Sequence, residues 1–259
     1  MNPDHIKNVI SPFIRVHLKE SGASGAVIGL SGGIDSTITA YLTTRAIGAE
    51  NVLGILLPIQ NLTPEQDTDD AIDIADRLGI EYRVIEISGI LRSFSGFIPD
   101  YDPGAAVSNG NLIARIRMCV LYYYANILNR MVIGTGNRTE LLIGYSTKYG
   151  DSGVDIEPIG DLYKTEVFEL ARHLGVPKQI IEKLPSARLW AGQTDEGELG
   201  MQYKEIDRIL RMLVDEGLSA EEVAARGVPE DSVSRIANLV RASEHKRHAP
   251  PRAGGKTET

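Results

Sequence analysis

The strongest chemical signal in the sequence is the stretch GLSGGIDS at residues 29–36. It follows an apolar run and precedes residues with helical spacing, so it would present the unpaired N–H groups of a helix N-terminus. Gly32 and Gly33 would let an anion approach the backbone, and the Ser31 and Ser36 hydroxyls are further donors. The pattern predicts a phosphate-binding loop. The alternative is a glycine turn in which Asp35 or Ser36 only caps the helix.

The carboxylate of Asp35 would repel phosphates bound to this loop unless a cation lay between them. A magnesium ion that bridges the carboxylate and the phosphates removes the repulsion, and it indicates a nucleoside triphosphate rather than a simple phosphate. The chain contains no GxxxxGK(S/T) motif, which excludes a Walker loop. The run Gly134-Thr135-Gly136 is not a dinucleotide-binding fingerprint, because Thr139 replaces its third glycine.

A second polar stretch, residues 134–155, follows an apolar run that predicts another strand. Ligands of open parallel sheets bind beyond the carboxyl ends of the strands, so Thr135 and Glu140 should face the same crevice as residues 29–36. Glu140 could be a second magnesium ligand. Lys148 and Asp155 lie in a Gly/Ser-rich segment, and Lys164 could neutralise a phosphate. Taken singly, each charge could instead be a solvated surface group, and Lys164 an ordinary first-turn lysine.

The elements that must position these residues follow from periodicity, since apolar runs predict strands and apolar residues at helical spacing predict helices. Strands are expected at residues 26–30, 52–57, 82–87 and 131–134, with a fifth near Pro158 and Ile159. Helices are expected at residues 2–20, 38–47, 64–78, 112–128, 164–174, 202–216, 219–226 and 230–243. Residues 93–111 are expected to be partly loop, residues 186–200 a long loop, and residues 253–259 frayed.

This alternation of strands and helices predicts an α/β fold. We expect three α/β/α layers with a mostly parallel sheet and helical N- and C-terminal extensions. Neither a repeat nor a linker divides the chain, so we expect a single domain over residues 1–259.

Composition restricts the class of protein. The 259 residues are 42% hydrophobic and carry a net charge of −8, which is ordinary for a globular protein and unfavourable for non-specific nucleic-acid binding. No apolar run approaches the roughly 18 residues of a membrane span, and the first residues lack the apolar core of a signal peptide. The single cysteine, Cys119, excludes a disulfide framework and is expected to be a small buried filler. We therefore expect a cytoplasmic protein without nucleic-acid or membrane partners.

The loop at residues 29–36 resembles the PP-loop of the ATP pyrophosphatase superfamily. Further runs resemble NAD synthetases, in order along nearly the whole chain: NLIARIR (111–117), GTGNRTELLIGYSTKYGDSGVDIEPIG (134–160), LYKTEV (162–167), LPSARLWAGQTDEGELG (184–200) and EHKR (244–247). The resemblance implies an adenine nucleotide alpha hydrolase-like fold and the last step of NAD biosynthesis. In that step ATP activates the nicotinate carboxylate of deamido-NAD as an acyl-adenylate, and ammonia then gives NAD, AMP and pyrophosphate.

The resemblance also implies roles for single residues. The positions that match ATP-binding residues are Gly29, Leu30, Ser31, Gly32, Gly33, Ile34, Asp35, Ser36, Thr135, Lys164 and Ser186. Asp35 and Glu140 match magnesium positions, and the positions that match deamido-NAD-binding residues are Arg115, Lys148, Asp155, His245 and Lys246. The candidates for catalysis are Asp35, Lys164 and Asp155. The chain departs from the family at Ser186, where threonine is frequent, and around Arg138, whose role stays open.

The match to the synthetase leaves no room for a glutamine-hydrolysing domain, so free ammonia is the expected nitrogen donor, although a separate glutaminase could supply it. The resemblance further implies a homodimer with the substrate near the subunit interface. The alternatives are another PP-loop ligase, such as a tRNA-thiolating enzyme, and an adenine-nucleotide sensor without catalysis. Thiolation usually needs catalytic cysteines, and this chain has one cysteine.

Overall fold

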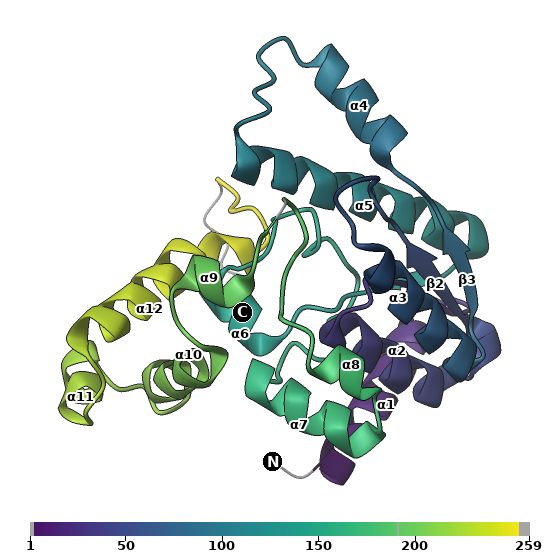
Figure 1. The fold of residues 1–259 in the computed structure, drawn as a ribbon. Helices are drawn as coiled ribbons and strands as arrows, with labels where there is room; N and C mark the ends of the chain where they lie inside the picture. Colours follow the sequence, from purple (N-terminus) through teal and green to yellow (C-terminus); the bar gives the residue numbers. More distant parts are fainter. Residues whose placement is uncertain (1–2, 191, 254–259) are drawn as a thin grey trace.

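The computed structural model describes residues 3–190 and 192–253 (Figure 1). Its strands are β1 (Ala26–Gly29), β2 (Val52–Leu56), β3 (Glu81–Val84) and β4 (Met131–Ile133). Its helices are α1 (Pro3–Ser21), α2 (Ile34–Ile47), α3 (Glu65–Leu78), α4 (Ser88–Phe97), α5 (Ala106–Leu128), α6 (Arg138–Ile143), α7 (Lys164–Leu174), α8 (Lys178–Ile181), α9 (Asp195–Leu199), α10 (Tyr203–Leu210), α11 (Ala220–Ala225) and α12 (Glu230–Ala242). A π-helical turn, η2 (Arg211–Asp215), follows α10.

The four strands form one sheet in the order β3-β2-β1-β4, and every neighbouring pair is parallel. Ala26 in the central strand β1 lies opposite both Val52 and Met131, so β1, β2 and β4 begin in register. The carboxyl ends of these strands therefore meet at one edge of the sheet, and the loops that follow them share that edge.

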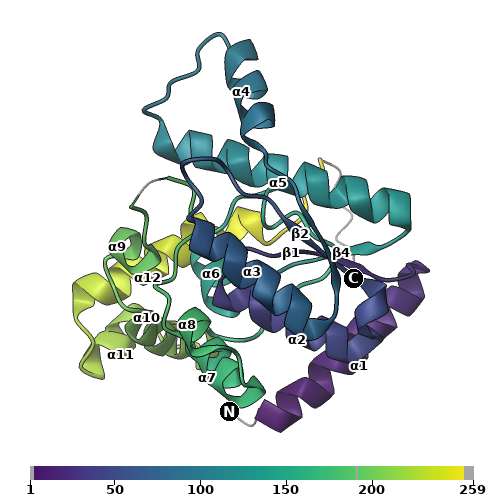
Figure 2. The same ribbon diagram turned by 45° about the vertical axis from the view of Figure 1, so that its right-hand side comes forward.

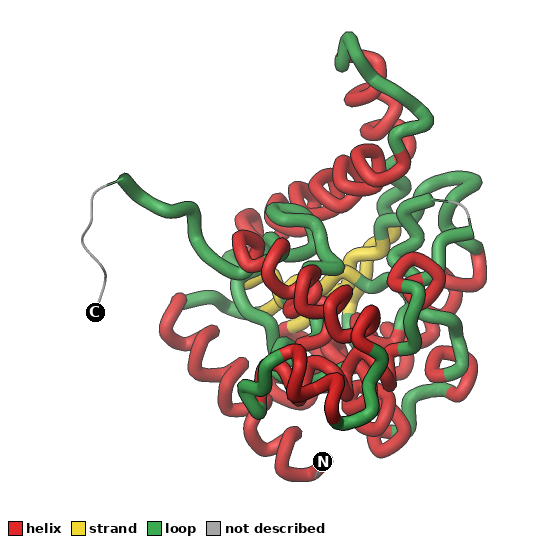
Figure 3. The backbone as a smooth tube through the Cα atoms, turned by 90° about the vertical axis from the view of Figure 1, so that its left-hand side faces the viewer, coloured by secondary structure: helices red, strands yellow, loops and turns green. Residues whose placement is uncertain are grey.

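Alternate residues of the strands face opposite layers of helices. Ala26 and Ile28 pack with α1, α2, α3 and α7, whereas Val27 packs with α5 on the other face. Figure 2 shows α1, α2 and α3 along one side of the sheet and α5 along the other, and Figure 3 shows the strands enclosed between helical layers. The predicted α/β/α layering is confirmed.

The C-terminal helices form a core of their own beside the sheet. Residues of α9 to α12 pack around Ile206, Ile209 and Ile236, with Ile143 of α6 and Tyr163 joining them. Figure 1 shows α10, α11 and α12 grouped on one side of the molecule, away from the strands. No helix in the described part of the chain is long and apolar enough to cross a membrane.

Several sequence predictions need correction. The fifth strand near Pro158 is absent from the described residues, where an isolated bridge joins Ile133 to Ile156, because the chain turns at the proline, which has no N–H for a ladder. The third strand ends at Val84 rather than residue 87. Cys119 is exposed, because it lies on the outer face of α5, so the expectation of a buried filler is wrong.

The predicted loops contain more helix than expected. The partly helical segment 88–105 includes α4, and α5 begins at residue 106 instead of 112. The long loop at 186–200 contains the five-residue helix α9. These helices are short or rich in glycine and serine, so local propensity does not reveal them. Most of the predicted frayed end, residues 254–259, lies outside the described residues.

Candidate active site

A cleft of ≈ 520 Å³ opens at the carboxyl edge of the sheet. Its walls come from the loops after β1, β2 and β4, from the middle of α5, and from residues 183–198. Gly29, Leu30, Ser31, Gly33, Ile34, Asp35 and Ser36 all line it, as do Thr135, Glu140, Lys164, Ser186 and Lys246. The prediction that Thr135 and Glu140 share one crevice with the first loop is confirmed.

The glycine loop is held in shape by its own contacts. Gly32 has φ +72°, and a Cβ there would lie 2.1 Å from the backbone oxygen of Asp67, so no side chain fits. The Ser31 and Ser36 hydroxyls lie 3.0 Å apart, and the Ser36 hydroxyl also donates to the Gly33 oxygen. The N-cap of α2 is Gly33, so the alternative that Asp35 or Ser36 caps the helix is wrong.

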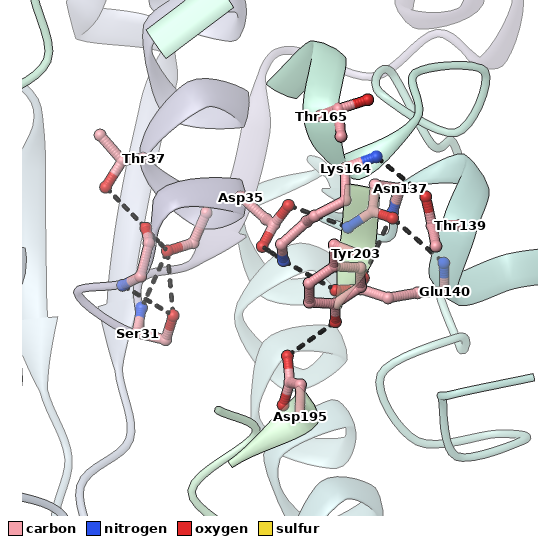
Figure 4. Close-up of polar contacts among 12 residues, drawn as sticks. Ser31, Asp35, Thr37, Asn137, Thr139, Glu140, Lys164, Thr165, Asp195 and Tyr203 are labelled. Carbon is pink, nitrogen blue, oxygen red and sulfur yellow. Dashed lines mark hydrogen bonds and ion pairs between the residues drawn. The ribbon is translucent and has the colours of Figure 1, made fainter. Parts of the chain in front are cut away.

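A compact group of charges in the cleft surrounds Lys164, the first residue of α7 (Figure 4). Its Nζ donates to Asp35 Oδ2 at 2.6 Å and to Glu140 Oε1 at 3.0 Å. The Lys164 side chain is 2% exposed, so the ammonium is held between two carboxylates with almost no water. The three residues come from α2, α6 and α7, far apart in the sequence.

The electrostatics of this group favour a charged lysine. Burial alone would lower the pKa of Lys164, but the Asp35 and Glu140 carboxylates outweigh it and raise that pKa. Burial raises the pKa of Glu140 to about 7, against the opposing charge of Lys164. The cluster thus holds more acidic groups than basic ones and suits an additional cation.

Three residues that the sequence did not reveal complete this cluster. Asn137 donates to Asp35 Oδ1 at 3.0 Å while its Oδ1 accepts from Glu140 N, so the cap of α6 also fixes the Asp35 carboxylate. Tyr203 places its ring 5.1 Å from Lys164 Nζ. The Tyr203 hydroxyl donates to Asp195 Oδ2 at 2.8 Å, which brings the buried Asp195 beside the lysine.

A second cluster ties the glycine loop to the segment that precedes α9. Lys183 donates to Gly32 O at 2.9 Å and to Asp67 Oδ1 at 2.8 Å, and it also pairs with Asp70. Arg188 donates to the other oxygen of Asp67. Asp67 is buried, so this cluster anchors the segment on the loop. Within the same segment, Ser186 donates to the Gln193 oxygen at 2.7 Å.

The residues that match deamido-NAD positions are only partly in the cleft. Arg115 donates to the Lys148 oxygen, and Lys148 donates to the His245 oxygen, so these three form one group outside the cleft lining. Lys246 lines the cleft and donates to Gly144 O and Ser146 O at 2.7 Å each. Asp155 lies apart from the cleft lining and is exposed, where it accepts from the Tyr122 hydroxyl and from Val132 N.

Arg138 connects α6 to η2, which follows the C-terminal helix α10. Its guanidinium pairs with Asp161 and with Asp215 of η2, and it lies 5.3 Å from the Tyr163 ring. The Tyr163 hydroxyl also donates to Asp215. The contacts of Arg138 thus join α6 to η2 rather than reach the cleft.

The family model described as NAD synthase matches residues 6–250. The chain belongs to the NAD synthase family. The NH(3)-dependent NAD(+) synthetase of Methanosarcina acetivorans is 51% identical over 252 residues, which cover 97% of this chain and 98% of that one.

Solved structures agree with this assignment. The NMN synthetase from Francisella tularensis has a TM-score of 0.86 and 37% identity, with 98% of this chain and 99% of that chain covered. The NH3-dependent NAD synthetase from Campylobacter jejuni has a TM-score of 0.83 and 33% identity, with 98% and 100% covered. The family and fold predicted from the sequence are confirmed.

Proposed function

We propose that the chain forms NAD by ATP-dependent amidation of deamido-NAD with free ammonia, releasing AMP and pyrophosphate. Membership of the NAD synthase family confirms the predicted ligase class. The observation that carries the proposal is Lys164, buried between Asp35 and Glu140 beside a glycine loop that is preformed for phosphates. The whole chain would act as one catalytic domain.

The site suits the first half of this reaction, the transfer of the adenylyl group to a carboxylate. A carboxylate is a poor electrophile, and adenylation gives it a good leaving group. Backbone N–H groups at the start of α2 and the Ser31 and Ser36 hydroxyls would bind the phosphates that leave as pyrophosphate. Thr135 and Ser186 line the same cleft and would add hydroxyl contacts to ATP.

The residues also fit magnesium. Asp35 and Glu140 offer carboxylate oxygens, the hard donors that Mg²⁺ prefers, and this ion is commonly held by one or two carboxylates together with substrate phosphates. When bound, the ion would offset the charge of the triphosphate. Lys164 would hold the two carboxylates in position for the ion and place a positive charge beside the leaving group. These roles of Asp35, Glu140 and Lys164 are part of the proposal.

The deamido-NAD site would extend beyond the cleft. Arg115, Lys148 and His245 form a connected group near Lys246, and Asp155 presents an exposed carboxylate. We propose that a second copy of the chain completes this part of the site. The outer face of α5 supports a dimer, because Tyr123 is 62% exposed and Ile127 58% exposed there.

Free ammonia is the proposed nitrogen donor, and a separate glutaminase would be needed for glutamine to serve. The single cysteine supports this, because Cys119 lies on the outer face of α5, not in the cleft lining, where a nucleophile would be needed. A low cysteine content also suits a reducing compartment, and we propose a cytoplasmic location.

The test is AMP formation by the purified chain with magnesium and ATP. Deamido-NAD and its mononucleotide counterpart are compared as acceptors, each with ammonium or with glutamine. We expect AMP and NAD with deamido-NAD and ammonium, and neither when one of these is omitted. Faster turnover of the mononucleotide would make the chain an NMN-forming enzyme, the activity for which one of the compared structures is named. ATP binding without acceptor-dependent AMP would indicate a nucleotide sensor. Equal rates of NAD formation with glutamine and with ammonium, in a preparation free of glutaminase, would refute the assignment of ammonia as the nitrogen donor.

A further inference from the structure

Five cationic side chains line the cleft, and four of them are committed to protein partners. Lys164 pairs with Asp35 and Glu140, Lys183 and Arg188 pair with Asp67, and Lys246 donates to two backbone oxygens. Arg117 of α5 is the fifth. Among the described cleft residues it is the one cation for which the structure shows neither a hydrogen bond nor an ion pair.

The surroundings of Arg117 make that unpaired charge costly. The side chain is only partly exposed, and burial lowers the pKa of its guanidinium to about 10, with Asp151 opposing the shift. A guanidinium carries five N–H donors, and a desolvated cation without a partner is destabilising. An anionic ligand in the cleft would satisfy these donors.

Packing of α5 places Arg117 close to both proposed substrate loops. Leu121, one turn further along the helix, contacts the position of Gly29, where a Cβ would lie 3.5 Å from its Cδ1. Ala114 and Met118 pack in the same way against Gly150 and Gly153. Arg117 therefore lies between the start of the glycine loop and the segment that contains Asp151.

The chemistry of the first step indicates which anion Arg117 would bind. A carboxylate oxygen of the acceptor must form a bond to the α-phosphorus of ATP, while the bond from that phosphorus to pyrophosphate breaks and pyrophosphate leaves with the electron pair. Two negatively charged groups must therefore meet. A planar guanidinium holds a carboxylate in a bidentate fork better than an ammonium does.

We propose that Arg117 binds the carboxylate of the nicotinate ring and holds it against the α-phosphate. Met118, Leu121 and Val154 line the cleft as well and give the aromatic ring an apolar wall. This inference rests on the proposed function, because it assigns the acceptor subsite of that reaction. Arg117 takes no part in the covalent change.

The test compares Arg117→Met and Arg117→Lys with a control, Arg77→Met. Arg77 is exposed on α3, outside the cleft lining, and forms its ion pair with Asp73 of the same helix, so its loss should leave every measured quantity unchanged. The dissociation constants of deamido-NAD and of ATP are measured separately by calorimetry. Formation of the adenylate is measured as pyrophosphate release in a single turnover without ammonia.

For Arg117→Met we expect adenylate formation to fall by about 100-fold and deamido-NAD to bind at least about 10-fold more weakly, with ATP affinity unchanged within about threefold. Arg117→Lys should recover part of the affinity but little of the rate, because it keeps charge and loses the fork. It also serves as the readout if the methionine variant does not fold.

Unchanged deamido-NAD binding and adenylate formation in both variants would overturn the inference while leaving the proposed function intact. Weaker binding of ATP alone would also overturn it, because it would assign Arg117 to the nucleotide phosphates. If the unmodified chain forms no adenylate from deamido-NAD, the proposed function fails and the inference fails with it.

Discussion

Replacing Lys164 by methionine tests whether charge, rather than packing, is what this buried lysine contributes. In the unmodified chain the Asp35 and Glu140 carboxylates both accept from the Lys164 ammonium. Methionine keeps an unbranched apolar stem but removes the ammonium, so it leaves the two carboxylates facing one another. Two close, largely covered carboxylates cannot both remain ionised at low cost, so loss of the ammonium should raise the pKa of Glu140 above its value of about 7 and keep that group protonated to a higher pH in the folded variant.

The cost of that proton gives the size of the effect. Protonating a carboxyl group costs about 1.4 kcal/mol for each pH unit above its ordinary pKa of about 4.3. In the unmodified chain Glu140 already holds this proton up to its pKa of about 7, so the two proteins should differ little in this respect at pH 5 and pH 6. Above about pH 7 the variant should lose about 1.4 kcal/mol more of unfolding free energy for each pH unit, which is about 1.4 kcal/mol at pH 8 and a drop in Tm of about 4 °C for a chain of this size. The sign follows because in this window the folded variant keeps a proton that the unfolded chain and the folded unmodified chain release, so the stability of the variant relative to the unmodified chain falls as pH rises.

The assay is thermal unfolding of both proteins at pH 5, 6, 7 and 8, followed by circular dichroism. Lys178→Met is the matched control, because Lys178 is 84% exposed and should contribute little at any pH. Magnesium should raise the Tm of Lys164→Met more than that of the unmodified chain, since it would supply the missing positive charge. A loss of stability that is equal at pH 5 and pH 8 would refute the reasoning and indicate a packing defect.

Two further predictions concern the carboxyl groups of Asp35 and Glu140 in the cleft and that of Glu157, which accepts a hydrogen bond from Gly136 N. Asp35→Asn and Glu140→Gln should each lower AMP formation by orders of magnitude, and each should also lower Tm because the buried Lys164 loses one of its two carboxylate partners. The two effects on the rate should be far from additive because both act through one ion; near-normal rates and magnesium dependence in Asp35→Asn would contradict the metal assignment. Burial raises the pKa of Glu157 to about 8, so this group favours the folded state less as pH rises from about 4.5 to 8. Glu157→Gln keeps an acceptor for Gly136 N, and its Tm relative to the unmodified chain should increase from pH 5 to pH 8; a constant difference would contradict this.

The part of the site that sequence predicts well is the part that is local in the chain. The glycine loop could be recognised because a strand, a turn without side chains and a helix N-terminus follow one another within a few residues. Glu140 could be placed in the same crevice because strands that are parallel bring their following loops to one edge. Both arguments need only strand order and direction.

The part that sequence misses depends on contacts between distant segments. Asn137 contacts Asp35 from 102 residues away, and nothing in its neighbourhood distinguishes it from an ordinary helix cap. Asp195 belongs to a segment that was expected to be loop and Tyr203 to the helix expected after it, and neither pattern indicates that the two side chains pair beside Lys164. Cys119 shows the same limit, since helical periodicity does not say which face of α5 is covered.

The position of Lys164 explains why fold and chemistry share residues here. A lysine in the first turn of a helix opposes the helix dipole, and burial adds a desolvation cost. The Asp35 and Glu140 carboxylates offset both, while Glu140 also closes the capping box of α6 with Asn137. The start of α6, the start of α7 and the first turn of α2 are therefore fixed by the same charges that would meet ATP. A substitution in this cluster changes folding and activity together, so only a variant whose Tm is unchanged reports on the chemistry alone.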